Sequence, residues 1–265
     1  MKKNRLDLLL TELNLVETRS LAQRLIMAGH VRVDDQIVFK PATMVASDAT
    51  ITIDQGKKFV SRGGEKLEAA LEEFRLKDLD KKICADVGAS TGGFTDCLLS
   101  HGAKKVYAID VGQGILHWKL RRDPRVVSFE KTNVRHLKML PEKVDVITID
   151  VSFISLTKVT PVVVNWLKNE SGIVVALIKP QFEAGRTEAA RGKGVIRDTL
   201  VHSQILNRVL DQLAAEQFEI RGLMKSPLLG PKGNMEFLVY LGYPGVNTMN
   251  IVSSVHEILY NEENE

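Results

Sequence analysis

The sequence has 265 residues and little cysteine, few aromatic residues and no long apolar run. Its two cysteines, Cys84 and Cys97, are too few for a disulfide framework or a zinc cluster, which favours a reducing compartment. No apolar stretch approaches the roughly 20 residues that cross a bilayer. The N-terminal apolar stretch is broken by Asp7 and Glu12, and no cleavage site follows it. These absences predict a cytoplasmic protein without a membrane span or a secretory signal.

Neither sign of charge dominates, because 36 Lys and Arg residues oppose 33 Asp and Glu residues and leave a formal net charge of +3. This mild basic excess permits a nucleic-acid partner without requiring one. Hydrophobic residues at 44% and charged residues at 26% are ordinary for a globular protein. The length fits one large domain, or a small domain joined to a medium one.

The first sixty residues predict a small unit of helices and short strands. Leucines at helical spacing between residues 6 and 13 indicate a first helix. Ser20 and Gln23 have the form of a capping box, which predicts a second helix from that point. Residues 31–40 and 49–53 read as strands, with a polar turn inside the first range.

Cationic side chains surround these elements and are suited to gripping a phosphate backbone. Acidic residues occur in the same segment, so a solvated polar face is the alternative. The stretch TRSLAQRLIMAGHVRVDDQIV resembles the RNA-binding module of ribosomal protein S4, in which two helices and a turn dock on structured RNA. The resemblance favours RNA binding, read through shape and phosphates. The expected RNA contacts in this part are Arg5, Arg19, Arg24 and Lys40.

From residue 81 onward, strand and helix signals alternate, and the apolar runs are typical of strands buried on both faces. This pattern predicts an α/β fold with a doubly wound, mostly parallel sheet, whose ligands bind at the carboxyl ends of the strands. Helices are expected at residues 92–100 and 114–120. The expected strands are ICADV, VYAID, VVSFE, VDVITID and GIVVALIK.

The first of these strands runs into a glycine-rich loop, DVGASTGGF, at residues 86–94. Its glycines allow a ligand to approach the backbone closely, although a lone loop of this kind is often only a packing turn. The acid Asp86 would repel a pyrophosphate and attract a cation, which favours S-adenosylmethionine over a dinucleotide. Asp110 ends the second strand, where a carboxylate can accept from both hydroxyls of an adenosine ribose.

Asn133 and Val134 follow the third strand, at a position suited to the adenine edge, although an ordinary helix cap is the alternative. We expect the methyl donor to contact the loop and the residues that end these strands. The full expected set is Asp86, Gly88, Ala89, Ser90, Thr91, Gly92, Gly93, Phe94, Asp110, Val111, Asn133, Val134 and Asp150.

Four charged residues are expected to meet at the same edge of the sheet. Asp150 and Lys179 end two strands, Glu236 precedes a late antiparallel strand, and Lys66 lies in the first turn of a helix. Each alone is more often a surface ion pair. Together they suit methyl transfer to a hydroxyl, with Lys179 taking the proton, Lys66 steadying the alkoxide and the two acids orienting the lysines. This chemistry needs no metal.

Seven motifs resemble the TlyA family, also called haemolysin A: SRGGEKL, DVGASTGGFTD, VYAIDVGQG, DPRVV, DVSFISL, IKPQFE and GNMEFL. The catalytic part is similar to the FtsJ-type ribose methyltransferases, whose Lys-Asp-Lys-Glu tetrad matches Lys66, Asp150, Lys179 and Glu236. The resemblance implies 2′-O-methylation of ribosomal RNA, at a cytidine, with S-adenosylmethionine as donor. It also implies an S4-type domain at 1–56, a linker at 57–62 and a Rossmann-like methyltransferase domain with a seven-stranded sheet at 63–265.

Two other functions stay open at this point. A ribosome-assembly factor would bind RNA without turnover, and a pore-forming haemolysin would need a membrane-inserting segment that the sequence does not offer. The expected partners are ribosomal RNA or ribosomal subunits, with no membrane, metal or obligate protein partner. Residues 181–198 are either a plain flexible loop or a mobile arm that closes on RNA. The arm would add Arg186, Arg191 and Lys193 as phosphate contacts.

Overall fold

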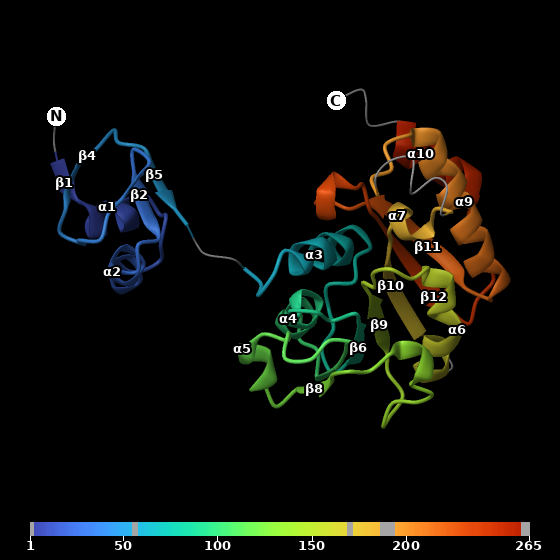
Figure 1. Ribbon diagram of the computed structural model, residues 1–265. Helices are drawn as coiled ribbons and strands as arrows, with labels where there is room; N and C mark the ends of the chain where they lie inside the picture. The colour runs from blue at the N-terminus through green and yellow to red at the C-terminus, as the bar shows by residue number, and fades with distance from the viewer. Residues whose placement is uncertain (1–2, 55–57, 169–171, 186–193, 261–265) are drawn as a thin grey trace. The chain divides into compact units, whose positions relative to one another are not determined.

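The computed structural model describes residues 3–54, 58–168, 172–185 and 194–260. The chain forms two compact units, residues 1–58 and residues 59–265. Figure 1 labels most of the helices and strands of both units. Each unit has its own hydrophobic core, so each is described by itself.

The N-terminal unit packs two short helices against two small antiparallel sheets. Its core is a cluster of buried aliphatic side chains from both helices and the strands, including Leu6, Leu10 and Ile26. One sheet pairs β1 with β4, and the other has the order β3-β2-β5. The elements are α1 (Leu6–Glu12), α2 (Arg19–Met27), β1 (Lys3–Arg5), β2 (Val31–Val33), β3 (Gln36–Ile37), β4 (Met44–Ala46) and β5 (Ile51–Ile53).

Helix α2 starts differently from the sequence prediction. The capping box assigned to Ser20 and Gln23 is wrong: Thr18 is the N-cap, and its hydroxyl oxygen accepts a hydrogen bond from the Leu21 amide at 3.2 Å. Gln23 instead donates its side-chain amide to Asp7. A competing threonine two residues earlier, with the extended backbone that an N-cap needs, explains the shift.

The large unit is built on one seven-stranded sheet of order β11-β12-β10-β9-β6-β7-β8. Strands from β10 to β8 in this order run parallel, whereas β12 is antiparallel to both of its neighbours. The predicted fold class, an α/β Rossmann-like sheet of seven mostly parallel strands, is confirmed. The strands are β6 (Ile83–Val87), β7 (Lys105–Ile109), β8 (Val126–Phe129), β9 (Val146–Ile149), β10 (Gly172–Ile178), β11 (Glu219–Lys225) and β12 (Phe237–Tyr243).

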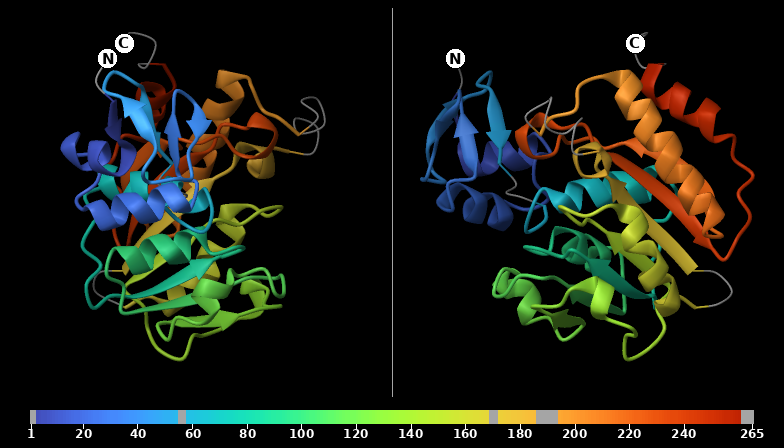
Figure 2. Two further views of the ribbon diagram at one scale, coloured as in Figure 1. Left: turned by 90° about the vertical axis from the view of Figure 1, so that its left-hand side faces the viewer. Right: turned by 45° about the vertical axis from the view of Figure 1, so that its right-hand side comes forward.

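Helices cover both faces of this sheet, as the two views in Figure 2 show. Alternate strand residues face opposite layers: Cys84 packs with α3 and α4, while Ala85 and Val87 pack in the cluster that includes α9 and α10. The helices are α3 (Gly63–Glu73), α4 (Gly93–Ser100), α5 (Trp118–Arg121), α6 (Thr160–Val163), α7 (Pro180–Glu183), α9 (Thr199–Ala215) and α10 (Ile251–Tyr260), with 3₁₀ turns at Val134–His136, Leu156–Lys158, Val164–Trp166 and Pro231–Gly233.

Two local predictions need correction. The helix expected over residues 114–120 begins only at Trp118, because Gly114 has a left-handed backbone (φ 73°) and His117 caps the turn by accepting from the Lys119 amide. Phe59, inside the span expected to be linker, is buried in the core of the large unit. Its neighbour Val60 donates its amide to Asp96 on α4 at 2.9 Å.

The strand order sets the position of the ligand crevice. From β6 the chain runs outward to β7 and β8, and then crosses back to place β9 on the other side of β6. In parallel sheets of this kind, the crevice forms at the carboxyl ends of the strands where the order reverses. The loops after β6 and β9 therefore flank the expected site.

Candidate active site at the carboxyl edge of the sheet

Two lysine–carboxylate pairs lie at this edge of the sheet. Lys66, in the first turn of α3, places its Nζ 2.6 Å from Oε2 of Glu236, the residue before β12. Lys179, directly after β10, places its Nζ 2.5 Å from Oδ1 of Asp150, directly after β9. Parallel β9 and β10 end together, and antiparallel β12 begins beside the end of β10, so the topology brings these residues to one edge.

The Lys66–Glu236 pair is held by several contacts. The Glu236 side chain is fully buried and that of Lys66 is nearly so. Gln181 on α7 donates to the other carboxylate oxygen of Glu236 at 3.1 Å. A Cβ on Gly230 would lie 2.0 Å from Glu236 Oε1, so the loop before β12 closes tightly over this carboxylate. Glu236 therefore has little freedom to leave Lys66.

Lys179 is also mostly buried, and its ammonium has a second polar partner. Its Nζ donates to the Ser152 hydroxyl at 3.2 Å and lies 5.9 Å from the centre of the Phe182 ring. Asp150 is more accessible than its partner and lines both cavities described below. Asp150 is thus the member of the pair that is open to the crevice, whereas Lys179 lines neither cavity.

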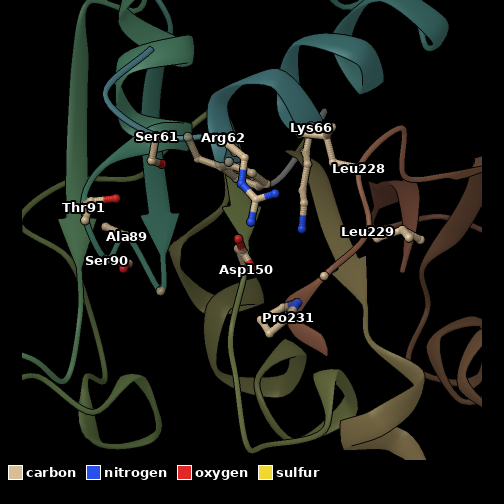
Figure 3. A pocket seen from close by; sticks show the side chains of 15 residues that line it. Ser61, Arg62, Lys66, Ala89, Ser90, Thr91, Asp150, Leu228, Leu229 and Pro231 are labelled. Atoms are coloured by element: carbon tan, nitrogen blue, oxygen red, sulfur yellow. The ribbon is translucent and has the colours of Figure 1, made fainter. Parts of the chain in front are cut away.

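Two cavities meet at this edge and share Gly88, Ser90 and Asp150 in their walls. The smaller one, of about 330 Å³, is lined by the start of α3, the glycine-rich loop and the loop before β12. Figure 3 shows Arg62 and Lys66 extending into it toward Asp150. The larger one, of about 860 Å³, lies beside the ends of β7 and β9. Its volume falls in the usual range for a cofactor-sized ligand.

At Gly88 the glycine-rich loop packs closely against the protein's own backbone. Gly88 is left-handed (φ 84°), and a Cβ there would lie 2.4 Å from the main-chain oxygen of Asp150. Six of its residues line the smaller cavity: Gly88, Ala89, Ser90, Thr91, Gly93 and Phe94. Gly92 faces away from both cavities, because a Cβ on it would meet Leu120 and Leu116.

The expected contact between Asp86 and a cationic ligand does not fit the structure. Asp86 lies inside β6, is fully buried and lines neither cavity. Its carboxylate oxygens accept hydrogen bonds from the hydroxyls of Thr95, at 2.6 Å, and Thr148, at 3.2 Å. Burial raises the pKa of Asp86 to about 7, and these hydrogen bonds only partly oppose that shift. Asp86 therefore ties β6 to α4 and β9.

Asp110 follows β7 and lines the larger cavity. Its two oxygens accept from the backbone amides of Ser90, at 2.8 Å, and Gly112, at 2.7 Å. Each oxygen keeps a further lone pair for a ligand hydroxyl. Asn133 and Val134 also line this cavity, although Asn133 at the same time caps a 3₁₀ turn by accepting from the Arg135 amide. Val111 lines it with a largely exposed side chain.

The structure adds cavity residues that the sequence reasoning missed. Ser61 and Arg62 line the smaller cavity, and the SRGGEKL motif that contains them was the available signal. Phe153 lines the larger cavity with 91% of its surface exposed, a left-handed backbone (φ 63°), and its ring centre 4.9 Å from that of Phe182. An exposed phenylalanine with that backbone is unusual, and only the DVSFISL motif marked it beforehand.

The expected RNA contacts differ in their surroundings. Arg5 and Arg19 both bind the buried carboxylate of Asp7, whereas Arg24 and Lys40 are exposed on the surface of the N-terminal unit. Arg186, Arg191 and Lys193 lie outside the described residues. Within the described ranges, no three His, Cys, Asp or Glu side chains gather in a way that could hold a metal ion. No helix there is long and apolar enough to cross a membrane.

Comparison with known proteins agrees with this architecture. Residues 59–243 match the model of the FtsJ-like methyltransferases, and residues 4–51 match the S4 domain. A Bacillus subtilis protein, YqxC, provisionally named an rRNA methyltransferase, is 48% identical over 92% of this chain and 87% of its own length. The 16S/23S rRNA (cytidine-2′-O)-methyltransferase TlyA of Mycobacterium tuberculosis is 41% identical over 91% of this chain and 90% of that protein.

A solved structure shows the same similarity over both units. The Streptococcus thermophilus protein, provisionally named a hemolysin, is 40% identical, has a TM-score of 0.73, and the match covers 98% of this chain and 96% of that one. The resemblance to the TlyA family is therefore confirmed. The chain belongs to the FtsJ-like methyltransferase family and carries an S4 domain in its N-terminal part.

Proposed function

We propose that this protein transfers a methyl group from S-adenosylmethionine to the 2′-hydroxyl of a cytidine in ribosomal RNA, in the cytoplasm. The observation that carries the proposal is the pair of buried lysine–carboxylate contacts, Lys66–Glu236 and Lys179–Asp150, beside the two joined cavities. The choice of cytidine and of ribosomal RNA is supported by the name of the Mycobacterium tuberculosis relative.

The larger cavity fits S-adenosylmethionine by its volume and its donor set. Asp110 offers free acceptor positions for the ribose hydroxyls, and Asn133 and Val134 offer a polar and an apolar group near an adenine ring. The left-handed Gly88 lets the glycine-rich loop pack against the backbone of Asp150, and both residues line the two cavities. When bound, the cofactor supplies an electrophilic methyl group on a sulfonium. Ser61 and Arg62 are then suited to the carboxylate end, in the smaller cavity.

Each of the four residues would have its own role in the methyl transfer. Lys179, as the neutral amine, accepts the proton of the 2′-hydroxyl and becomes an ammonium, and Asp150 holds its Nζ in place at the carboxyl edge. Lys66 stabilises the negative charge that develops on the attacking oxygen, and Glu236 keeps Lys66 in place. Burial strengthens each of these interactions relative to water. Alignment of the acceptor oxygen with the methyl group supplies much of the remaining acceleration.

The chain provides a matched control for Lys179. A second Lys–Asp pair lies near the opposite ends of β9 and β10: Lys168, four residues before β10, places its Nζ 2.8 Å from Oδ1 of Asp145, directly before β9. Lys168→Ala removes a lysine–aspartate contact of the same chemistry but leaves the crevice untouched. If Lys179→Ala loses activity and Lys168→Ala keeps it, the loss is due to the role of Lys179 in the reaction at the carboxyl edge.

The test is incubation of the purified protein and radiolabelled S-adenosylmethionine with ribosomal subunits and naked RNA from a strain that lacks the gene. We expect label in a 2′-O-methylated cytidine after nuclease digestion, retained with Lys168→Ala and lost with Lys179→Ala. Label on a base would contradict the ribose acceptor. No label on any RNA, with donor binding verified separately, would favour the non-catalytic assembly factor.

A further inference from the structure

A buried carboxylate organises two of the arginines in the N-terminal unit. Arg5 donates to both oxygens of Asp7, from Nε to Oδ1 at 3.0 Å and from Nη2 to Oδ2 at 2.9 Å. Arg19 Nε and Gln23 Nε2 each donate to Oδ2 at 3.0 Å. The arginines come from different elements, β1 and α2, yet both guanidinium groups meet at one oxygen.

The location of Asp7 argues for a role beyond stability. It lies on α1 between Leu6 and the buried leucines at 9 and 10, and it is fully buried itself. A carboxylate in such a position is tolerated only when its lone pairs are satisfied, and an apolar side chain would serve stability at least as well. The hydrogen bonds from Arg5, Gln23 and Arg19 hold the pKa of Asp7 well below its usual range despite its burial. The carboxylate therefore stays charged.

The two guanidinium groups remain available to a ligand. The side chains of Arg5 and Arg19 are 39% and 50% exposed. Arg5 uses Nε and Nη2 on Asp7, which leaves its other terminal nitrogen, and Arg19 uses only Nε in its hydrogen bond. Two guanidinium groups and one carboxylate leave one net positive charge at the cluster. Side chains held in this way lose little further freedom when they bind a phosphate.

We propose that Asp7 is a positioning residue that holds Arg5 and Arg19 as a preformed clamp for one phosphate of the RNA backbone. The proposal rests on the proposed function, because it takes RNA as the ligand of this unit. Gln23 adds a third donor to Oδ2 of Asp7, beside the two arginines. Asp7 itself does not contact the RNA.

The substitution Asp7→Asn separates positioning from simple charge. It raises the net charge of the unit by one, so charge alone predicts tighter RNA binding. Loss of the clamp predicts weaker RNA binding. Asp35→Asn is the matched control, because it makes the same change in charge at an exposed turn whose left-handed backbone (φ 65°) asparagine tolerates.

The experiment measures RNA titrations and methylation kinetics of the full chain with ribosomal RNA. For Asp7→Asn we expect the KM for RNA to rise about tenfold, which corresponds to one clamp contact. The kcat at saturating RNA and the Kd for S-adenosylmethionine should stay within about twofold of the wild type. Asp35→Asn should bind RNA as tightly as the wild type or slightly more tightly. Unchanged or tighter RNA binding by folded Asp7→Asn overturns the proposal.

Folding of the N-terminal unit is checked by hydrogen exchange over residues 3–54, because both tryptophans, Trp118 and Trp166, belong to the large unit. If Asp7→Asn unfolds the unit, the variant Arg19→Lys tests the clamp instead. It keeps the positive charge but removes the planar guanidinium group that binds Asp7 and the phosphate together. Weaker RNA binding by that variant supports the clamp, and unchanged binding overturns it. A wild-type protein that neither binds nor methylates RNA would instead refute the proposed function.

Discussion

Lys66 and Glu236 are 170 residues apart in the chain, and their charged atoms lie 2.6 Å apart at the carboxyl edge of the sheet. The contact joins the first turn of α3 to the residue before β12, so it forms only when the whole sheet is assembled. Because both side chains are nearly or fully buried, removal of one leaves an uncompensated charge on the other.

The first prediction concerns this pair. Lys66→Met should lower the single-turnover rate of methylation by about 10²–10³, the usual cost of losing one donor to a developing oxyanion. Glu236→Gln should lower it less, because Lys66 remains but is no longer oriented. If Glu236 acts through Lys66, the double variant should be no slower than Lys66→Met alone. A double variant that is much slower would assign Glu236 an independent role.

The second prediction uses the close approach of Gly230 to Glu236. Gly230→Ala would place a methyl group 2.0 Å from the present position of Glu236 Oε1, and the backbone there (φ −71°) accepts alanine without strain. The carboxylate must therefore shift away from Lys66 or Gln181. At saturating cofactor we expect at least a tenfold slower transfer, of the size of a weakened catalytic hydrogen bond, with tryptophan fluorescence unchanged. A full rate in this variant would show that Glu236 tolerates displacement.

The third prediction tests the larger cavity. Asp110→Ala removes an acceptor for the ribose hydroxyls and also frees the amides of Ser90 and Gly112. Calorimetry should show a Kd for S-adenosylmethionine about 10- to 100-fold higher, as expected for one or two hydrogen bonds to a charged group. Asp123→Ala, which removes a carboxylate paired with Arg125 outside the cavities, is the control and should bind the cofactor normally. Equal affinity in both variants would place the ribose elsewhere.

The fourth prediction follows from the buried acid in β6. Burial raises the pKa of Asp86 from its ordinary value of 3.8 to about 7, so between these values the folded protein holds a proton that the unfolded chain has released. The contribution of Asp86 to the free energy of unfolding is therefore complete below about pH 4 and is lost as the pH rises to about 7. The loss is at most roughly 4 kcal/mol.

Urea unfolding followed by tryptophan fluorescence at pH 5 and pH 7.5 measures this change, because both tryptophans report on the large unit. Asp86→Asn should be less dependent on pH over that interval than the wild type. The same pH dependence in both proteins would mean that another group is responsible.

The amino-acid pattern alone predicts the sheet and most of its carboxyl edge. Continuous apolar runs mark β6, β7, β9 and β10 as strands buried on both faces, and the residue that follows a parallel strand must lie at its carboxyl end. That is why Asp110, Asp150 and Lys179 could be assigned to the carboxyl edge from position alone. The need for a close backbone approach at Gly88 was also predictable, although the group that approaches it is the backbone of Asp150.

The contacts of the charged side chains depend on how the folded chain packs. Asp86 was expected to face a ligand, but strand periodicity does not reveal that Thr95 and Thr148 enclose it in the core. Ser61 and Arg62 become cavity residues only because α3 packs beside the glycine-rich loop. From the sequence, Arg5 and Arg19 are expected to be free cations, whereas the structure shows that both pair with Asp7. The hydropathy pattern of the sequence predicts which apolar segments are buried. Ion pairs depend on distances between side chains, and these distances exist only in the folded chain.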